Sequence, residues 1–330
     1  MKLTRREFMK RTAIAGAGVA LLPRMAWPFS QSPLGVTKFT VTLPGLGAGG
    51  ANNIGNYIPA LAPDTKRYNG TDYYEIVAKQ FTQQVHPAIP PTTFWGYADA
   101  ATLDSRYLGG VIVAQSGRPV RLKVTNKLPA RHILPVDPTL VDPIMAAETG
   151  GRQDRIAVHL HGGLVHWQFD GGPFHWFTNA RNPGGFVHGS SFINGVDEKA
   201  AVYDYPNCQS ARLIWYHDHA YGLTRINAYA GIATGYLITD SAEAVLIKTG
   251  ILPNPLSGLY TYGIPLIIQD KTFWDGGSSD PNYNLVVPAG AAAGSLWYPH
   301  VYEGGPPEDI PPMSPEPPDS TLKGRWEIHG

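Results

Sequence analysis

Cysteine is nearly absent from this 330-residue chain: the single Cys208 leaves no partner for a disulfide within it. Cys208 lies in a turn-like stretch without a flanking histidine, which favours a structural thiol over a metal ligand. Charge is also scarce, since charged residues make up 16% of the chain and 26 basic residues balance 26 acidic ones. No net field attracts nucleic acid or an anionic membrane surface, so neither partner is expected.

Long apolar runs are missing as well. The stretch 12–22 is only moderately apolar and too short to span a bilayer. It follows the paired arginines Arg5 and Arg6, a pattern typical of a twin-arginine export signal. We therefore expect a signal peptide over 1–30, the twin-arginine export machinery as a partner, no membrane span in the mature chain, and a periplasmic or extracellular location.

Glycine and proline are abundant instead, with 37 and 30 residues, and long helical patterns are hard to find. This composition predicts an all-β fold, a Greek-key sandwich or barrel. We expect a first domain over 31–242, then a linker and the start of a second domain over 243–330. Strands are expected at 38–43, 73–81, 111–114, 119–126, 155–158, 211–216, 231–239 and 265–270, with a hairpin joining 111–114 to 119–126 and a short helix over 241–248.

Two histidine pairs, His159-Leu160-His161 and His217-Asp218-His219, each follow a short apolar run. Residues i and i+2 of a strand point to the same face, so two neighbouring strands would gather four imidazoles. Imidazole suits copper, zinc, iron and nickel, and the lack of a nearby thiolate argues against a closed zinc-cysteine site. The alternative is a set of polar residues at strand ends, but two pairs among 11 histidines favour a metal site. Three histidines of the loop between the pairs are expected to be solvated: His166, His175 and His188.

The chain resembles the N-terminal copper motifs of multicopper oxidases, especially bacterial spore-coat laccases and bilirubin-oxidase-like relatives. The resemblance extends from about residue 33 over most of the chain. The motifs that carry it are His159-Leu160-His161-Gly162-Gly163, Trp215-Tyr216-His217-Asp218-His219-Ala220, Leu223-Thr224-Arg225, Gly231, Phe94-Trp95-Gly96-Tyr97, Tyr203-Asp204-Tyr205-Pro206-Asn207, 265–271 and Ser295-Leu296-Trp297-Tyr298-Pro299-His300.

This resemblance implies cupredoxin-like domains that bind copper, and one-electron oxidation of phenols, aromatic amines or metal ions coupled to the reduction of dioxygen to water. It implies that His159 binds a type 2 copper, that His161 and His217 share one type 3 copper, and that His219 binds the other. Asp170 falls where relatives carry an acidic residue near the dioxygen channel, and it would steer protons or hydrogen-bond water. An Asx-type turn is the alternative role for Asp170.

One departure from the family pattern limits this expectation. The remaining four cluster histidines and the cysteine-centred type 1 site of the family are not among these residues; beyond His219 only His300 and His329 follow. We therefore expect an N-terminal portion of an oxidase, with an incomplete second cupredoxin-like domain, weakened copper binding and no turnover by this chain alone. An exported copper-binding or copper-delivery cupredoxin without turnover is the main alternative. A dinuclear zinc hydrolase is a remote one, because the usual Asp-His continuation after a His-x-His pair is missing.

Overall fold

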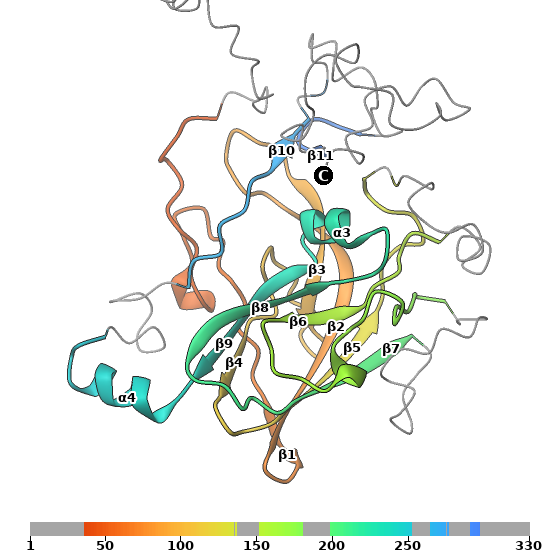
Figure 1. Cartoon of the computed structure of the whole chain (residues 1–330). Coiled ribbons are helices and arrows are strands. Elements are labelled where there is room, and N and C mark those ends of the chain that lie inside the picture. The colour runs from red at the N-terminus through yellow and green to blue at the C-terminus, as the bar shows by residue number, and fades with distance from the viewer. Residues whose placement is uncertain are drawn as a thin grey trace, which may run out of the picture. The chain divides into compact units, whose positions relative to one another are not determined.

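Strands predominate in the structure, a computed structural model that describes residues 36–134, 136, 152–180, 199–252, 265–274, 276 and 291–297. They form two main sheets (Figure 1). The first sheet contains β1 (Asp64–Tyr68), β2 (Thr71–Gln83), β3 (Thr92–Asp99), β5 (Val120–Asn126) and β7 (Ala200–Tyr205). The second contains β4 (Ile112–Gln115), β6 (Val158–His161), β8 (Arg212–Asp218) and β9 (Ala233–Thr239).

Among the described residues, two helices and two single turns of 3-10 helix accompany the sheets. They are α3 (Thr224–Ala230), α4 (Ser241–Lys248), η1 (Ala48–Gly50) and η3 (Trp167–Phe169). The expected helix at 241–248 is confirmed as α4, and the Asp240 side chain caps it by accepting a hydrogen bond from the Glu243 backbone N–H. The turn of helix α3 was not expected; it ends at Gly231, whose φ of 119° suits glycine.

Strand order shows how the chain passes between the sheets. The first sheet runs β1-β2-β5-β7 with β3 also on β2, and the second runs β4-β9-β8-β6. The predicted hairpin between 111–114 and 119–126 is therefore wrong, because β4 and β5 lie in different sheets. The turn between them is hydrogen-bonded to two distant segments. Ser116 N–H donates to the Thr239 carbonyl, and Gly117 N–H donates to the Asn207 carbonyl. The connection is a crossover, and the predicted all-β sandwich is confirmed.

The core lies between the inner faces of the two sheets. Alternate residues of β5 are buried, and side chains from both sheets fill one hydrophobic cluster. Several of its buried tyrosines use their hydroxyls in hydrogen bonds: the Tyr203 hydroxyl accepts from the Val158 N–H at 3.0 Å, and Tyr236 donates to Asn207 Oδ1 at 2.8 Å. The Tyr203 contact fixes the first residue of β6 from the opposite sheet.

Two expected strands are not formed. The backbone at 38–43 turns instead, with Phe39 at a φ of 62°, and the Asn53 side chain accepts from Thr42 N–H and donates to the Thr40 carbonyl. Residues 265–270 form no strand. The short strands β10 (Thr272–Phe273) and β11 (Leu296–Trp297) pair antiparallel beyond them.

All described residues belong to one compact unit that comprises 34–277 and 287–298. Phe273 and Leu296 are buried in a second hydrophobic cluster together with Phe94 of β3. The predicted domain boundary near residue 242 stays a prediction, and the expected signal at 1–30 lies outside the described residues. Within the described part, no helix has the length and apolarity needed to cross a membrane.

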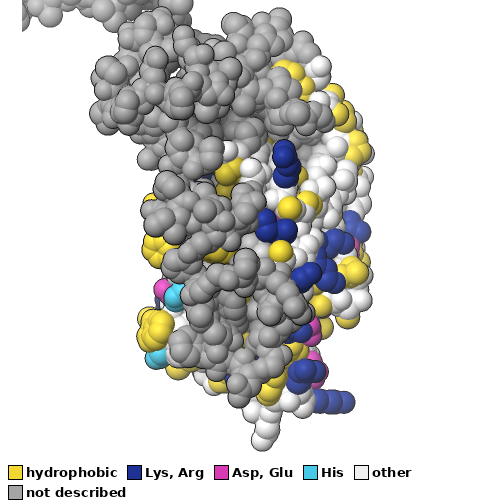
Figure 2. All heavy atoms as spheres, turned by 90° about the vertical axis from the view of Figure 1, so that its right-hand side faces the viewer, with side chains coloured by type: hydrophobic (Ala, Val, Ile, Leu, Met, Phe, Trp, Pro, Cys, Tyr) yellow, Lys and Arg dark blue, Asp and Glu magenta, His cyan; other side chains and the backbone are white. Residues whose placement is uncertain are grey.

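Basic side chains are spread over the face seen in Figure 2, with acidic ones among them. On the first sheet, Arg121 forms a two-bond ion pair with Asp204 at 2.7 and 2.8 Å, and Lys123 Nζ lies 2.7 Å from a Glu75 oxygen. All four side chains are partly exposed, so these pairs contribute little stability. Each ion pair neutralises two opposite charges on neighbouring strands of the first sheet.

Candidate metal centre

Strands β6 and β8 bring the two histidine pairs together. They pair antiparallel with His159 opposite His217 and His161 opposite Trp215. Val158 and Leu160 of β6 point into the core, so the alternate residues His159 and His161 face outward. The histidine face is therefore the outer face of the second sheet, supported from behind by a packed core.

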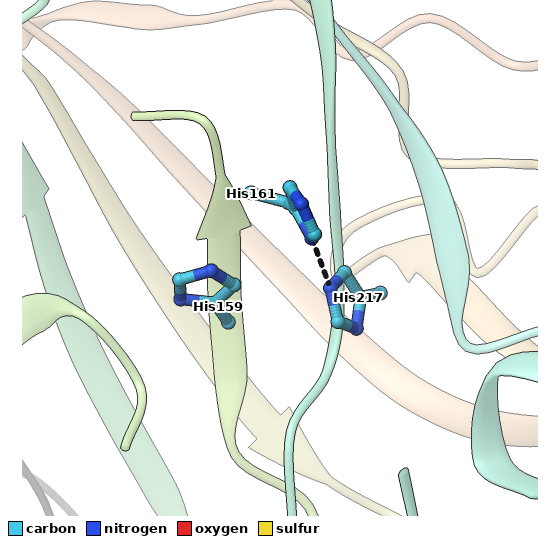
Figure 3. A group of neighbouring side chains, drawn as sticks. All are labelled: His159, His161 and His217. Atoms are coloured by element: carbon cyan, nitrogen blue, oxygen red, sulfur yellow. Dashed lines mark hydrogen bonds between the residues drawn. The ribbon is translucent and has the colours of Figure 1, made fainter. Parts of the chain in front are cut away.

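Three histidines form a tight group (Figure 3). One ring nitrogen from each of His159, His161 and His217 lies within 4.8 Å of the other two. His161 Nδ1 and His217 Nε2 are 3.2 Å apart. His217 is buried, His159 is half-buried and His161 is exposed, so the group opens to one side.

Backbone carbonyls fix the protons on two of these rings. His159 Nδ1 is 2.6 Å from the Asp170 carbonyl oxygen, and His217 Nδ1 is 2.6 Å from that of Asp218. A carbonyl can only accept, so both Nδ1 atoms carry the proton and both Nε2 atoms keep a lone pair. Metal-ligating histidines usually donate their second ring N–H in this way.

The His217 ring is held neutral by its surroundings. Burial, together with the neighbouring His159, His161 and His219, lowers the pKa of His217 to about 4, while the hydrogen bond to the Asp218 carbonyl opposes the shift. At neutral pH the ring is therefore uncharged. Since a metal binds only neutral imidazole, His217 needs no deprotonation before it can act as a ligand.

His219 lies just beyond the end of β8, beside the group of three. Its backbone N–H donates to the Ala157 carbonyl at 2.7 Å, and its ring is 4.9 Å from that of His159 between centroids. Its Nδ1 is buried without a hydrogen-bond partner among the described residues. Burial and His159 lower the pKa of His219. An unpaired, neutral ring nitrogen at this place suits a ligand.

Asp170 reaches His159 through a close backbone approach. Besides the carbonyl contact, Asp170 Oδ1 lies 3.3 Å from His159 Nδ1, and the carboxylate is about half exposed. The next residue, Gly171, has a φ of 67°, and a Cβ there would lie 2.0 Å from the Val158 carbonyl oxygen. Only glycine fits this position, so Gly171 sets the distance between the Asp170 carbonyl and His159.

A buried polar network joins the two histidine strands from behind. Asp218 Oδ1 accepts from Ala157 N–H at 2.8 Å; Oδ2 accepts from Ala220 N–H at 3.1 Å and from Asn227 Nδ2 at 2.8 Å. Asn227 of α3 also donates to the Arg155 carbonyl at 3.0 Å. Burial raises the pKa of Asp218 to about 7. The network ties β8 and α3 to the start of β6.

Sequence reasoning missed Gly171, Asp218, Asn227 and Trp215 as parts of this site. The i−2 spacing of Trp215 before His217 was a usable signal, because it places both on one strand face. His166 and His175 do not join the group of three, and His188 lies outside the described residues.

Comparison with known proteins finds relatives among the laccases. No protein-family profile matches the chain. A laccase of Bacillus stratosphericus is 38% identical over 221 residues, which are 67% of this chain and 38% of that laccase. A laccase of Haloferax volcanii is 34% identical over 280 residues, covering 83% of this chain and 42% of the relative.

A solved structure is also similar. The McoA multicopper oxidase of Aquifex aeolicus has a TM-score of 0.48 and 20% identity, and the similarity covers 80% of this chain and 38% of that one. The match thus spans less than half the length of each of these three proteins.

The sandwich and its outward histidine face define a cupredoxin-like domain with a candidate metal centre. The chain belongs to the multicopper oxidase family, and its partial coverage of the relatives fits an N-terminal portion of such a protein.

The residues present fit copper, the metal that the family implies. Three imidazoles are grouped, and no thiolate or carboxylate oxygen belongs to the group among the described residues. Two nitrogen ligands about 2.0 Å from one metal at a tetrahedral angle are roughly 3.3 Å apart. The 3.2 Å between His161 Nδ1 and His217 Nε2 matches that separation.

Proposed function

We propose that the two histidine pairs supply half of the histidine ligands of the copper cluster of a laccase-type multicopper oxidase. His159 would bind a type 2 copper, His161 and His217 would share one type 3 copper, and His219 would bind the other. The other ligands would come from further sequence of the same protein or from another chain. The whole protein would oxidise phenols, aromatic amines or metal ions and reduce dioxygen to water.

The ring nitrogens of the group carry this proposal. Both His159 and His217 hold Nδ1 in a hydrogen bond to a backbone carbonyl, which leaves Nε2 as the available donor atom. An ordinary pair of solvated histidines has no reason to share this arrangement or to be grouped within 4.8 Å. Second contacts of this kind orient imidazole ligands in metalloproteins.

Bound copper would supply one-electron redox chemistry, whereas the protein residues hold ligands and move protons. Asp170 is partly exposed and lies against His159, so it can pass protons from solvent toward the cluster. Asp218 holds β6 against β8 through the Ala157 N–H. Only four ligands come from the two pairs, so this chain by itself would bind copper weakly and would not turn over.

Copper binding by the purified chain tests the proposal. We expect Cu(II) to bind and electron paramagnetic resonance to show nitrogen hyperfine structure. The His217→Ala variant is expected to lose at least tenfold in affinity, while His166→Ala, which removes an exposed histidine outside the group of three, keeps wild-type affinity. Binding that is insensitive to His217→Ala, or no binding at all, would contradict the ligand assignment.

Oxygen consumption separates the oxidase from the copper-delivery alternative. The copper-loaded chain alone should not oxidise a phenol under either hypothesis, but a longer form that contains the remaining family ligands should do so only if the oxidase proposal holds. Intense blue absorption by the present chain would indicate a cysteine-bound copper and would overturn the assignment.

A further inference from the structure

Trp215 stands beside two of the candidate ligands. It lies two residues before His217 on β8 and directly opposite His161 of β6, so its side chain lies on the histidine face. Its indole is 4.1 Å from the His217 ring between centroids, with 23° between the planes. The His161 ring is 5.0 Å away, also at 23°. One indole therefore stacks on both imidazoles.

The indole lies nearly flat across these rings, with 23° between the planes in both stacks. Across β9, the residue opposite Trp215 is Gly235, where an added Cβ would meet Ile267 and Leu213 and not the indole. Trp215 is 38% exposed, so one part of the ring system meets solvent while the rest covers the histidines. An indole in this position shields the ring faces and leaves the ring edges, which carry the nitrogens, free to meet.

His161 has the greatest need of such support. Its imidazole is exposed, and its one hydrogen bond among the described residues is to His217. The rings of His159 and His217, in contrast, are each anchored by a backbone carbonyl. An exposed side chain loses rotamer freedom when it binds a metal, and a preformed orientation reduces that cost.

We propose that Trp215 is a positioning residue that holds the imidazoles of His161 and His217 with their nitrogens turned toward one shared metal. The proposal rests on the proposed function, since it requires these histidines to be ligands. Trp215 itself offers no ligand atom, because the indole nitrogen only donates. Its effect on copper passes through the two rings that it contacts.

Replacement of the indole tests the proposal. We expect Trp215→Leu to lower the Cu(II) affinity of the chain by about 10- to 100-fold, the range typical for groups that orient metal ligands. Trp215→Phe keeps a stacking ring and should recover most of the loss. Leu213→Ala is the matched control, because Leu213 lies on the same face of β8 and is 42% exposed, and it should bind copper as the wild type does.

A second readout needs no copper. In the metal-free wild type, the indole ring current should shift the ring protons of His161 and His217 upfield in histidine-selective NMR spectra, and Trp215→Leu should remove these shifts. Should the leucine variant not fold, Trp215→Met takes its place, and the wild-type spectrum alone still tests the stack. Wild-type shifts equal to those of histidine in an unstructured peptide would overturn the proposal.

The outcomes separate this proposal from the function on which it rests. If the wild type binds no copper, or binds it independently of His217, the proposed function fails. If copper binding depends on His217 but Trp215→Leu and Trp215→Met retain wild-type affinity within twofold, the positioning role alone is refuted.

Discussion

Gly171→Ala should break the hydrogen bond between the Asp170 carbonyl and the His159 ring. The new Cβ would lie 2.0 Å from the Val158 carbonyl oxygen, 2.4 Å from its carbon and 2.9 Å from the His159 nitrogen. All three are backbone atoms of the first two residues of β6, so no side-chain rotation can relieve the overlap. The loop must move away from the strand, and the 2.6 Å contact between His159 Nδ1 and the Asp170 carbonyl is lost with it.

Two costs add up in this variant. Alanine at a φ of 67° costs about 1–2 kcal/mol relative to glycine. The lost hydrogen bond costs roughly 0.5–1.5 kcal/mol more. Urea unfolding should therefore show a loss of about 1.5–3.5 kcal/mol. Because the His159 ring loses its orientation, Cu(II) affinity should fall by about 10- to 100-fold in a competition titration.

Gly117→Ala is the control for the backbone term. Gly117 has a φ of 77°, but an added Cβ would meet no atom within 4 Å. This variant should lose about 1–2 kcal/mol of stability and keep its copper affinity. Equal copper affinities for the Gly171 and Gly117 variants would refute the claim that the loop carbonyl orients His159.

Three further variants probe the surroundings of the site. Asp170→Asn keeps the backbone carbonyl, so copper affinity should stay within about threefold of wild type, far above that of Gly171→Ala; a loss as large as that variant's would make the carboxylate the main orienting group. Asn227→Leu removes a donor to buried Asp218 and should lower the unfolding free energy by about 2–4 kcal/mol in urea; a change below about 0.5 kcal/mol would contradict the network. Burial lowers the pKa of His132 to about 3, so below pH ~6.5 the unfolded chain takes up a proton that the folded chain refuses. Stability should fall as pH drops from ~6.5 toward 3, by at most about 1.4 kcal/mol per unit from this group. In His132→Phe, which loses the Leu134 N–H bond, stability should fall less steeply with pH; identical slopes in urea melts at pH 7.5 and 5 would refute this.

The arrangement of the histidine pairs was accessible from the sequence because it depends on strand period alone. Alternation puts His159 and His161 on one face, and the apolar runs before both pairs predict strands that can neighbour each other. The pairing of β6 with β8 confirms this prediction. The register that sets His159 opposite His217 could not be read from either run, since it is determined by how the two sheets pack.

Contacts between distant segments were beyond sequence reasoning. The segment from Gln115 to Arg118 looks like a hairpin turn, yet its Ser116 and Gly117 N–H groups donate to the distant carbonyls of Thr239 and Asn207. A local pattern cannot distinguish a hairpin from a crossover when the deciding partners lie about a hundred residues away. The same limit hid the approach of Gly171 to β6, which depends on where the loop folds back.

The three grouped rings are held in place by different contacts, and these contacts determine which ring nitrogens carry protons. Backbone carbonyls hold Nδ1 of His159 and His217, so the protonation pattern of these rings does not depend on the side chains at 170 and 218. His161 has its Nδ1 against His217 Nε2 and a stacked indole beside it. Because His217 Nε2 has no proton, His161 must donate in this contact, and its own Nε2 is then the atom with a free lone pair. A metal that took both nitrogens of the contact would require the His161 proton to move from Nδ1 to Nε2, whereas His159 already presents an Nε2 without a proton.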